Sequence, residues 1–314
     1  MLRSLTNVFY PARFQGARKR RAYFEGYYVK VVDAASELAV AFIPGVSYDA
    51  AGEGHAFVQV LDGVAGTAAY HRFESSALDY AATDFSLDVG PHRFGSRGMQ
   101  VDLPGARATL SFRQNTPWPS RWYSPGAMGP FTFVPGMECR HGVVSLHHGV
   151  SGTLNGRTLS PGAVGYIEKD WGRSFPRNWV WLQSSHLDGE TEPCCLMVSA
   201  GRVPFAGASF TGFIAALLWR GRFLPFTTYN GASLKLELRD EAAHLRFSRL
   251  GLTLKLVAHH APGINLVAPD QGGGMVGRVN ESLRAHADVT LTEGSREVLS
   301  TTARWMGFEV GGAW

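Results

Sequence analysis

Apolar and polar residues alternate with a period of two along nearly the whole chain, a pattern that favours β-strands. The alternation runs from Tyr27 to Asp33, from His55 to Leu61 and from Ala108 to Gln114, and Gly, Asp, Ser or Pro residues separate such stretches. Asn155 and Gly156 form an Asn-Gly pair that is typical of a tight hairpin turn. No convincing helix exceeds about two turns. We therefore expect an all-β protein with few short helices.

The number of these stretches indicates how the chain is divided. Roughly sixteen to eighteen strands are too many for one small closed barrel, whose interior about eight strands already fill. The length of 314 residues and a hydrophobic content of 45% allow two cores. We predict two antiparallel barrel- or sandwich-like halves that pack together with a pocket. The predicted boundary divides the chain into residues 1–164 and residues 165–314.

The stretch from Gly165 to Gln183 concentrates acidic and aromatic side chains near the middle of the chain. Glu168 and Asp170 are two residues apart, so on an extended backbone they share one face, with Lys169 on the other. Trp179 and Trp181 share a face in the same way. Two acids on one strand and two indoles on the next would line the same cavity if these faces point inward.

Other roles for these residues stay open at this point. Asp170 could cap a helical turn that begins at Trp171. Glu168 could form a buried ion pair with Arg173 or Arg177. Trp179 and Trp181 could pack in the core, as buried indoles commonly do.

Three stretches carry a resemblance to a known family. They are, in chain order, Tyr23 to Tyr28, Glu168 to Gln183, and Val310 to Trp314. They resemble motifs of the tocopherol cyclase family, whose members close the chromanol ring of vitamin E from a prenylated quinol. Gly165 to Gly172 is also distantly similar to the central motif of lipocalin-like carotenoid hydratases. Both resemblances imply two lipocalin-like halves and a reaction that starts by protonating an alkene.

This chemistry requires an acid that holds its proton at neutral pH. Burial and a neighbouring carboxylate both raise the pKa of a carboxyl group. The resemblance therefore implies that Glu168 is the proton donor and Asp170 its coupled partner. Glu25 is a further candidate, either as a second acid or as the base that accepts the phenol proton. Alternatively, Glu25 binds backbone N–H groups at the start of a strand.

A carbocation needs aromatic faces nearby and a site without water. Tyr27 and Tyr28 face opposite ways on a strand, so only one of them can line a pocket. The proline- and aromatic-rich segment 115–135 is either a lid or a cover for a sheet edge. The residues that we expect to contact substrate are Trp171, Trp179, Trp181, Tyr27, Tyr28, Phe175 and Gln183.

Several classes of protein find no support in the sequence. It has no Gly-x-Ser-x-Gly elbow, no Cys-x-x-Cys pair and no histidine pair with metal-ligand spacing, so we expect neither a cofactor nor a metal. Three cysteines form no disulfide framework, and no apolar run reaches the roughly 20 residues of a membrane span. We expect a cytoplasmic protein.

A mild positive charge of +4 is concentrated in Arg18 to Arg21. This cluster is either a solvated arm or a contact with an anionic membrane surface, which would make the protein membrane-peripheral. No motif supports nucleic-acid binding.

The expected function is acid-catalysed cyclisation of a prenylated quinol or a related isoprenoid in an apolar pocket, by a non-redox cyclase of the intramolecular lyase or isomerase type. Its partner would be a hydrophobic small molecule, a prenylated aromatic or an isoprenoid. Two alternatives stay open: a non-catalytic lipocalin-like carrier of an apolar isoprenoid, and an alkene hydratase of the carotenoid type.

Overall fold

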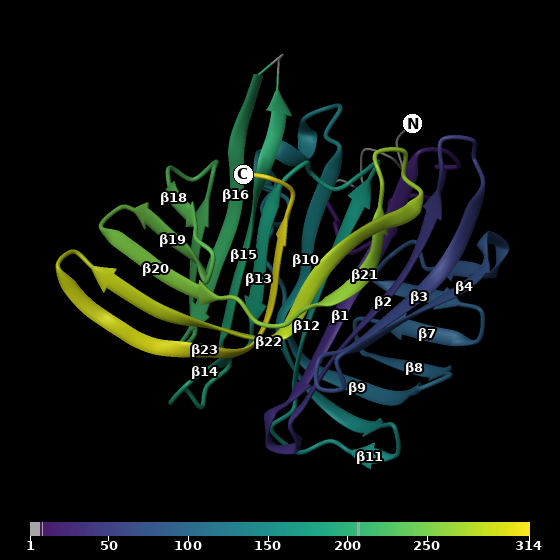
Figure 1. Cartoon of the computed structure of the whole chain (residues 1–314), viewed down its shortest axis with the longest axis horizontal. Helices are drawn as coiled ribbons and strands as arrows, with labels where there is room; N and C mark the ends of the chain where they lie inside the picture. The colour runs from purple at the N-terminus through teal and green to yellow at the C-terminus, as the bar shows by residue number, and fades with distance from the viewer. Residues whose placement is uncertain (1–6, 8, 206–207) are drawn as a thin grey trace. The chain divides into compact units, whose positions relative to one another are not determined.

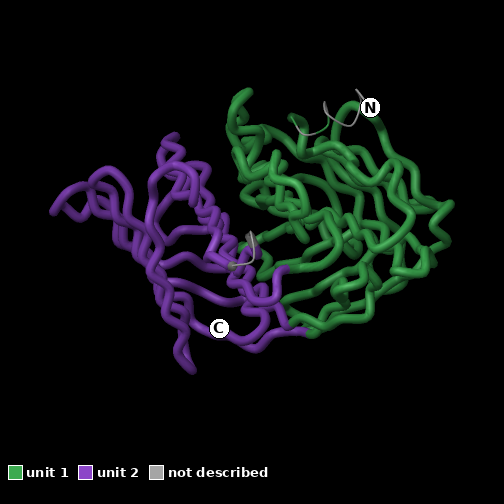
Figure 2. The backbone as a smooth tube through the Cα atoms, turned by 90° about the horizontal axis from the view of Figure 1, so that it is seen from above, with its two compact units in different colours: residues 1–175, 265–279 green, residues 176–264, 280–314 purple. Residues whose placement is uncertain are grey.

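The chain forms two antiparallel β-sheets in a computed structural model that describes residue 7, residues 9–205 and residues 208–314 (Figure 1). It divides into two compact units (Figure 2). Unit 1 comprises residues 1–175 and 265–279, and unit 2 comprises residues 176–264 and 280–314. The prediction of an all-β chain with two barrel-like halves is confirmed. Among the described residues, no helix has the length and apolar character needed to cross a membrane.

The first sheet follows the order β4-β3-β2-β1-β12-β10-β9-β8-β7-β6-β5, with β11 beside β10. Its strands are β1 (Tyr23–Asp33), β2 (Leu38–Tyr48), β3 (Gly54–Asp62), β4 (Thr67–Glu74), β5 (Leu78–Tyr80), β6 (Ser86–Val89), β7 (His92–Gly95), β8 (Gly98–Leu103), β9 (Ala106–Thr116), β10 (Cys139–Leu154), β11 (Arg157–Thr158) and β12 (Val164–Gly172). Three short 3₁₀ helices interrupt this half: η1 (Ala34–Ser36), η2 (Ser75–Ala77) and η3 (Gly129–Phe133).

The first sheet curls around an apolar core, and alternate residues of its strands point into that core. Alternate residues of β1, Tyr27, Val29 and Val31, belong to one buried cluster with alternate residues of β8 and β9. Phe73 on β4 lies 5.5 Å, between ring centroids, from His92 on β7, although these strands are far apart in the sheet order. Tyr27 likewise stacks on Phe85 at 4.2 Å. The first sheet therefore closes upon itself as a barrel-like half.

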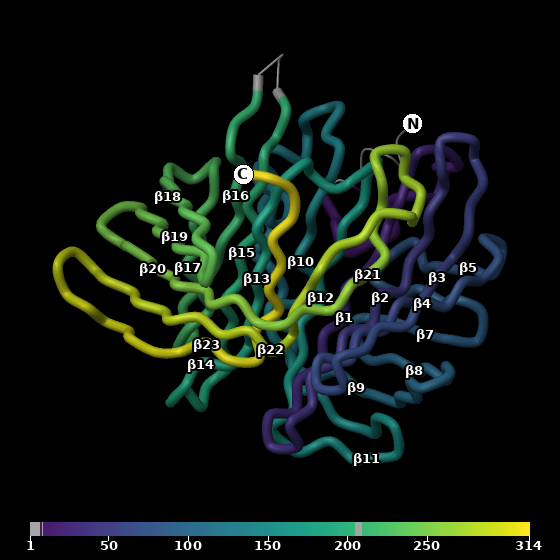
Figure 3. The backbone as a smooth tube through the Cα atoms, in the orientation of Figure 1, coloured from purple at the N-terminus to yellow at the C-terminus, as the bar shows by residue number. Residues whose placement is uncertain are grey.

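The second sheet follows the order β17-β16-β15-β13-β23-β22-β20-β19-β18, and the trace in Figure 3 shows its successive hairpins. Phe226 on β17 and Phe247 on β19 are 6.0 Å apart between ring centroids, so this sheet also curls. Its strands are β13 (Trp179–Ser184), β14 (His186–Leu187), β15 (Cys195–Phe205), β16 (Ala208–Trp219), β17 (Arg222–Thr227), β18 (Ser233–Leu238), β19 (Ala242–Arg249), β20 (Leu252–His259), β21 (Ile264–Pro269), β22 (Met275–Glu293) and β23 (Arg296–Gly311).

Strand β12, which carries Glu168 and Asp170, belongs to the first sheet and not to the second. It lies between β1 and β10, with Tyr28 and Val143 opposite Glu168 in the two neighbouring strands. The predicted boundary between residues 164 and 165 is therefore displaced: the units divide between Phe175 and Pro176. The reason is long-range pairing, because β12 completes the sheet that β1 began more than a hundred residues earlier.

Gly172 ends β12 in a conformation that a side chain disrupts. Its φ is +155°, and a Cβ there would lie 2.1 Å from the carbonyl oxygen of Glu138. We expect Gly172→Ala to lower the free energy of unfolding by about 3 kcal/mol or more, because backbone must move in two segments. Urea denaturation measures this. Gly162→Ala is the matched control, since nothing lies within 4 Å of its Cβ position; equal stability of the two variants would contradict the prediction.

Candidate functional site

His141, Glu168 and Asp170 form a cluster at the centre of the first sheet, in which His141 and Glu168 are buried and Asp170 is half-buried. His141 on β10 stands opposite Asp170 on β12, and its Nδ1 is 3.0 Å from Asp170 Oδ1. Its Nε2 is 3.4 Å from Glu168 Oε2. The imidazole therefore lies between the two carboxylates. The prediction that Glu168 and Asp170 share a face is confirmed, since one imidazole reaches both.

The two carboxylates change the acid–base behaviour of the imidazole. Burial lowers the pKa of His141, but the negative charges of Glu168 and then Asp170 outweigh burial and raise it to about 9. At neutral pH the cluster thus contains an imidazolium between two carboxylates. Tyr166, two residues before Glu168 on the same face, donates its hydroxyl proton to Glu168 Oε2 at 2.5 Å. Hydrogen bonds and ion pairs thus join the four side chains of Tyr166, Glu168, His141 and Asp170.

Sequence reasoning missed Tyr166 and His141. Tyr166 could have been found, because its spacing from Glu168 is the same as that between Glu168 and Asp170. No local pattern marks His141, because only the register between β10 and β12 brings it to Asp170.

The same three groups could hold a divalent cation. One ligand atom each of His141, Glu168 and Asp170 lies within 4.8 Å of the others. A bound cation would replace the proton between them, since each imidazole nitrogen already faces a carboxylate oxygen. Metal and proton are therefore alternatives at this cluster, and the expectation of no metal stays a prediction.

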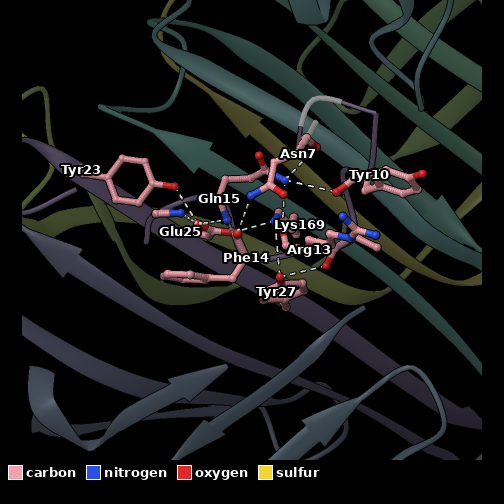
Figure 4. A network of polar contacts seen from close by, with 11 residues as sticks. Asn7, Tyr10, Arg13, Phe14, Gln15, Tyr23, Glu25, Tyr27 and Lys169 are labelled. Atoms are coloured by element: carbon pink, nitrogen blue, oxygen red, sulfur yellow. Dashed lines mark hydrogen bonds and ion pairs between the residues drawn. The ribbon is translucent and has the colours of Figure 1, made fainter. Parts of the chain in front are cut away.

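The opposite face of β12 carries a second buried ion pair, shown in Figure 4. Lys169 Nζ lies 2.5 Å from Glu25 Oε1, and both side chains are fully buried. Glu25 also accepts bonds from the backbone N–H groups of Gln15 and Gly16 and from the Tyr23 hydroxyl. Lys169 donates to the carbonyl oxygen of Arg13. This pair ties the segment before β1 to the barrel interior.

Three predicted site residues lie on this inner face rather than beside Glu168. Both carboxylate oxygens of Glu25 have partners, and these include backbone N–H groups, as the structural alternative for Glu25 expected; its role as acid or base stays a prediction. Tyr27 donates its hydroxyl proton to the carbonyl oxygen of Ala12. Trp171 belongs to the apolar core, with Lys169 Nζ 4.7 Å above its ring. Strand alternation separates all three from the acid cluster.

Two other predicted residues do lie on the Glu168 face of unit 1. Tyr28 stands opposite Glu168 in the pairing of β1 with β12, and it is almost completely buried. Phe175 packs edge-on against Phe24 at 5.3 Å between ring centroids. Phe24 and Tyr28 are four residues apart on β1, so they share this face. Aromatic rings therefore accompany the acid cluster along its own sheet.

Trp179, Trp181 and Gln183 belong to unit 2, on alternate positions of β13. The intervening Val180 and Leu182 enter the core of that unit. The prediction that the two tryptophans share a face is thus confirmed, and their contact with substrate stays a prediction. Trp179 Nε1 donates to Glu309 Oε1 at 2.5 Å, and Gln183 donates to the Ser185 hydroxyl.

Glu309 was missed by the sequence reasoning. It lies opposite Trp181 in the pairing of β13 with β23 and opposite the buried Glu281 in the pairing of β22 with β23. Unit 2 therefore presents its own carboxylates beside the two indoles.

The structure also decides among the structural roles considered for the motif. Asp170 lies within a continuous strand and pairs with His141, so it does not cap a helical turn. Arg173 pairs with Glu138.

A cavity of about 150 Å³, partly open to solvent, is formed by residues of unit 1 and does not include the acid cluster. Its lining residues include Val40, Phe42, Val60 and Leu154, which belong to the inner core. Because Glu168 points to the other face of the sheet, this cavity does not serve the cluster.

The fold is that of a two-unit, lipocalin-like β-protein. The family model described as tocopherol cyclase-like matches residues 143–312, more than half of the chain, and includes β12 and β13. The chain belongs to the tocopherol cyclase-like family.

Solved structures agree with the fold. A protein described as AttH from Nitrosomonas europaea matches with 14% identity and a TM-score of 0.52, covering 92% of each chain. This similarity shows the fold alone. A protein from Nostoc punctiforme matches 92% of this chain and 95% of its own with 8% identity, but its TM-score of 0.17 supports no argument.

Removal of one member of the inner ion pair should destabilise the protein strongly. We expect Lys169→Met to cost about 3–5 kcal/mol, because Glu25 is then buried without its counter-charge. The double variant Glu25→Gln, Lys169→Met should recover part of this loss. Chemical denaturation of the unmodified protein, the two single variants Glu25→Gln and Lys169→Met, and the double variant measures the coupling. Strictly additive effects of the two substitutions would contradict the prediction.

His141 should titrate near pH 9 in the native protein, as followed by NMR of its ring protons. Since its folded pKa of about 9 exceeds the ordinary 6.5, the paired imidazolium stabilises the fold fully below about pH 6.5. This contribution, roughly 3 kcal/mol, is lost as the pH rises through about 9. Glu168→Gln and Asp170→Asn should each lower the pKa of His141. Asp288 is a surface carboxylate beside His259, and Asp288→Asn should leave the pKa of His141 unchanged. A His141 pKa of 6.5 or below in the native protein would refute the assignment of a paired imidazolium.

Proposed function

We propose that this protein catalyses the proton-initiated cyclisation of a prenylated quinol or a related isoprenoid, without a redox cofactor. The observation that carries the proposal is the buried imidazolium of His141 between Glu168 and Asp170. Membership in the tocopherol cyclase-like family supports the reaction class.

Each side chain of the cluster has a place in the proposed proton path. His141 stores the proton, and Asp170 holds the imidazole through Nδ1. Nε2 faces Glu168 Oε2, so the proton passes to the Glu168 carboxyl group, which delivers it to the substrate alkene. The phenol oxygen then captures the tertiary cation, and the phenol proton returns to the cluster. Product and substrate are isomers, so no co-reactant is consumed.

Aromatic rings would stabilise the cation before ring closure. Tyr28 stands beside Glu168 on the neighbouring strand of the same sheet. Trp179 and Trp181 are proposed to contact the substrate through their rings, with roughly 0.5–2 kcal/mol for each ring well placed against a cation. Water must be absent from the site, because it would capture the cation and yield an alcohol.

Burial of the charged cluster favours catalysis over simple storage. Removing ionised groups from water costs several kcal/mol for each ion, and an apolar ligand gains nothing from them. A carrier of apolar isoprenoids would bind as well with hydrophobic residues at these positions. A hydratase would share the first step and differ only in the nucleophile.

The proposal is tested by incubating the purified protein with a prenylated quinol and measuring the product mass. We expect an isomer of unchanged mass. In Glu168→Gln turnover should fall by at least about a thousand-fold, because the proton donor is lost, while ligand affinity changes only a few-fold. Asp288→Asn is the matched control, as it removes a carboxylate from the exposed pair with His259.

Each other outcome identifies an alternative. A product heavier by one water would indicate a hydratase. Tight binding without turnover at any pH would indicate a carrier. Full activity of Glu168→Gln would remove Glu168 from the donor role.

A further inference from the structure

Among the described residues of unit 1, five large aromatic side chains are exposed. The Trp122 side chain is 81% exposed, and Tyr10, Tyr123 and Phe133 are each 50% exposed. Phe9 is 39% exposed and packs edge-on against Phe133, with 5.8 Å between ring centroids. An indole exposed to this degree is unusual on a water-soluble surface, where contiguous apolar groups mark sites of interaction. We call these five residues the aromatic face.

The two segments that carry the aromatic face meet at one end of the first sheet. Phe9 and Tyr10 precede β1, and the other three residues lie in the connection before β10. Phe24 near the start of β1 and Cys139 at the start of β10 both stand opposite Gly172 in their pairing with β12. Pro11 also packs against Gly126, where an added Cβ would come within 2.8 Å of its ring. The segments are therefore neighbours in space as well as in register.

The inner ion pair holds one of these segments in place. Lys169 binds the carbonyl oxygen of Arg13, and Glu25 binds the N–H groups of Gln15 and Gly16, a few residues after Phe9 and Tyr10 in the chain (Figure 4). The aromatic face is thus attached to the barrel by buried polar contacts.

Both of these segments carry a net positive charge. Residues 1–24 contain six Arg or Lys residues and no Asp or Glu, and residues 115–137 contain Arg121 and no acid. Arg18 to Arg21 are exposed and follow Arg13 in the chain by five to eight residues. Exposed Trp and Tyr together with basic residues match the interface of an anionic bilayer, where indole and phenol rings settle at headgroup depth.

We infer that the aromatic face docks onto the surface of a lipid bilayer that contains anionic lipids. Trp122 and Tyr123 enter the headgroup layer, and Arg18 to Arg21 bind lipid phosphates electrostatically. Each basic residue near such a surface contributes about a five-fold increase in affinity. Docking would give the protein access to apolar molecules that are dissolved in the membrane, but binding itself requires no turnover.

Co-sedimentation with vesicles tests this inference directly. Vesicles of phosphatidylcholine alone are compared with vesicles of phosphatidylcholine and phosphatidylglycerol in equal parts. We expect binding to the anionic vesicles, weakened by salt, with a blue shift of tryptophan fluorescence. The double variant Trp122→Ala, Tyr123→Ala should bind at least about ten-fold more weakly, because two interfacial rings are lost. The double variant Lys19→Glu, Arg20→Glu should lose the preference for anionic lipid.

Leu250→Ala is the matched control, since Leu250 is 87% exposed but lies in the β19–β20 turn of unit 2. It should bind like the unmodified protein, and all variants should keep the native circular dichroism spectrum. Two results would overturn the inference: no binding of the unmodified protein to anionic vesicles, or equal binding of the Trp122→Ala, Tyr123→Ala variant. Dimers that dissociate in that variant, without vesicle binding, would assign the face to a second copy of the chain. Neither result depends on whether the protein is a cyclase.

Discussion

The alternation of β12 places a different buried ion pair on each of its faces, and the organisation of unit 1 depends on both. On the inner face Lys169 pairs with Glu25 and thereby anchors the segment before β1. On the other face Glu168 and Asp170 surround His141. Three consecutive ionisable residues thus serve two separate purposes, because neighbouring side chains on a strand point to opposite sides.

Buried charges cost free energy, so each pair needs compensating contacts. Glu25 has four donors around it, two from backbone and two from side chains. Burial lowers the pKa of Lys169, and the Glu25 carboxylate opposes this shift. At the other cluster the carboxylates outweigh burial, since two of them face the His141 imidazole and raise its pKa. The first arrangement has a donor for each carboxylate lone pair that it uses and suits a structural anchor, whereas the second holds a protonated imidazole at neutral pH.

Local patterns predicted much of the fold. Period-two alternation correctly predicted strands, the Asn155-Gly156 turn correctly predicted the hairpin of β10 and β11, and the strand count correctly predicted two halves. The domain boundary was misplaced because β12 pairs with β1 and β10 across long sequence separations. Glu25 and Trp171 were candidate site residues, and strand parity places both of them inside the barrel, on the face opposite Glu168. Alternation shows which residues of one strand share a face, but it does not show which faces of different strands meet.

The sequence by itself determined which residues share a face: Tyr166, Glu168 and Asp170 on β12, and Trp179 and Trp181 on β13. That follows from the two-residue repeat of an extended backbone, which needs no partner strand. Only the tertiary structure decided which face carries which chemistry. The register of β10 against β12 brought His141 between the acids, and the return of the chain before β1 gave Lys169 and Glu25 their partners. Register depends on the sum of many pairings, so no single local motif encodes it.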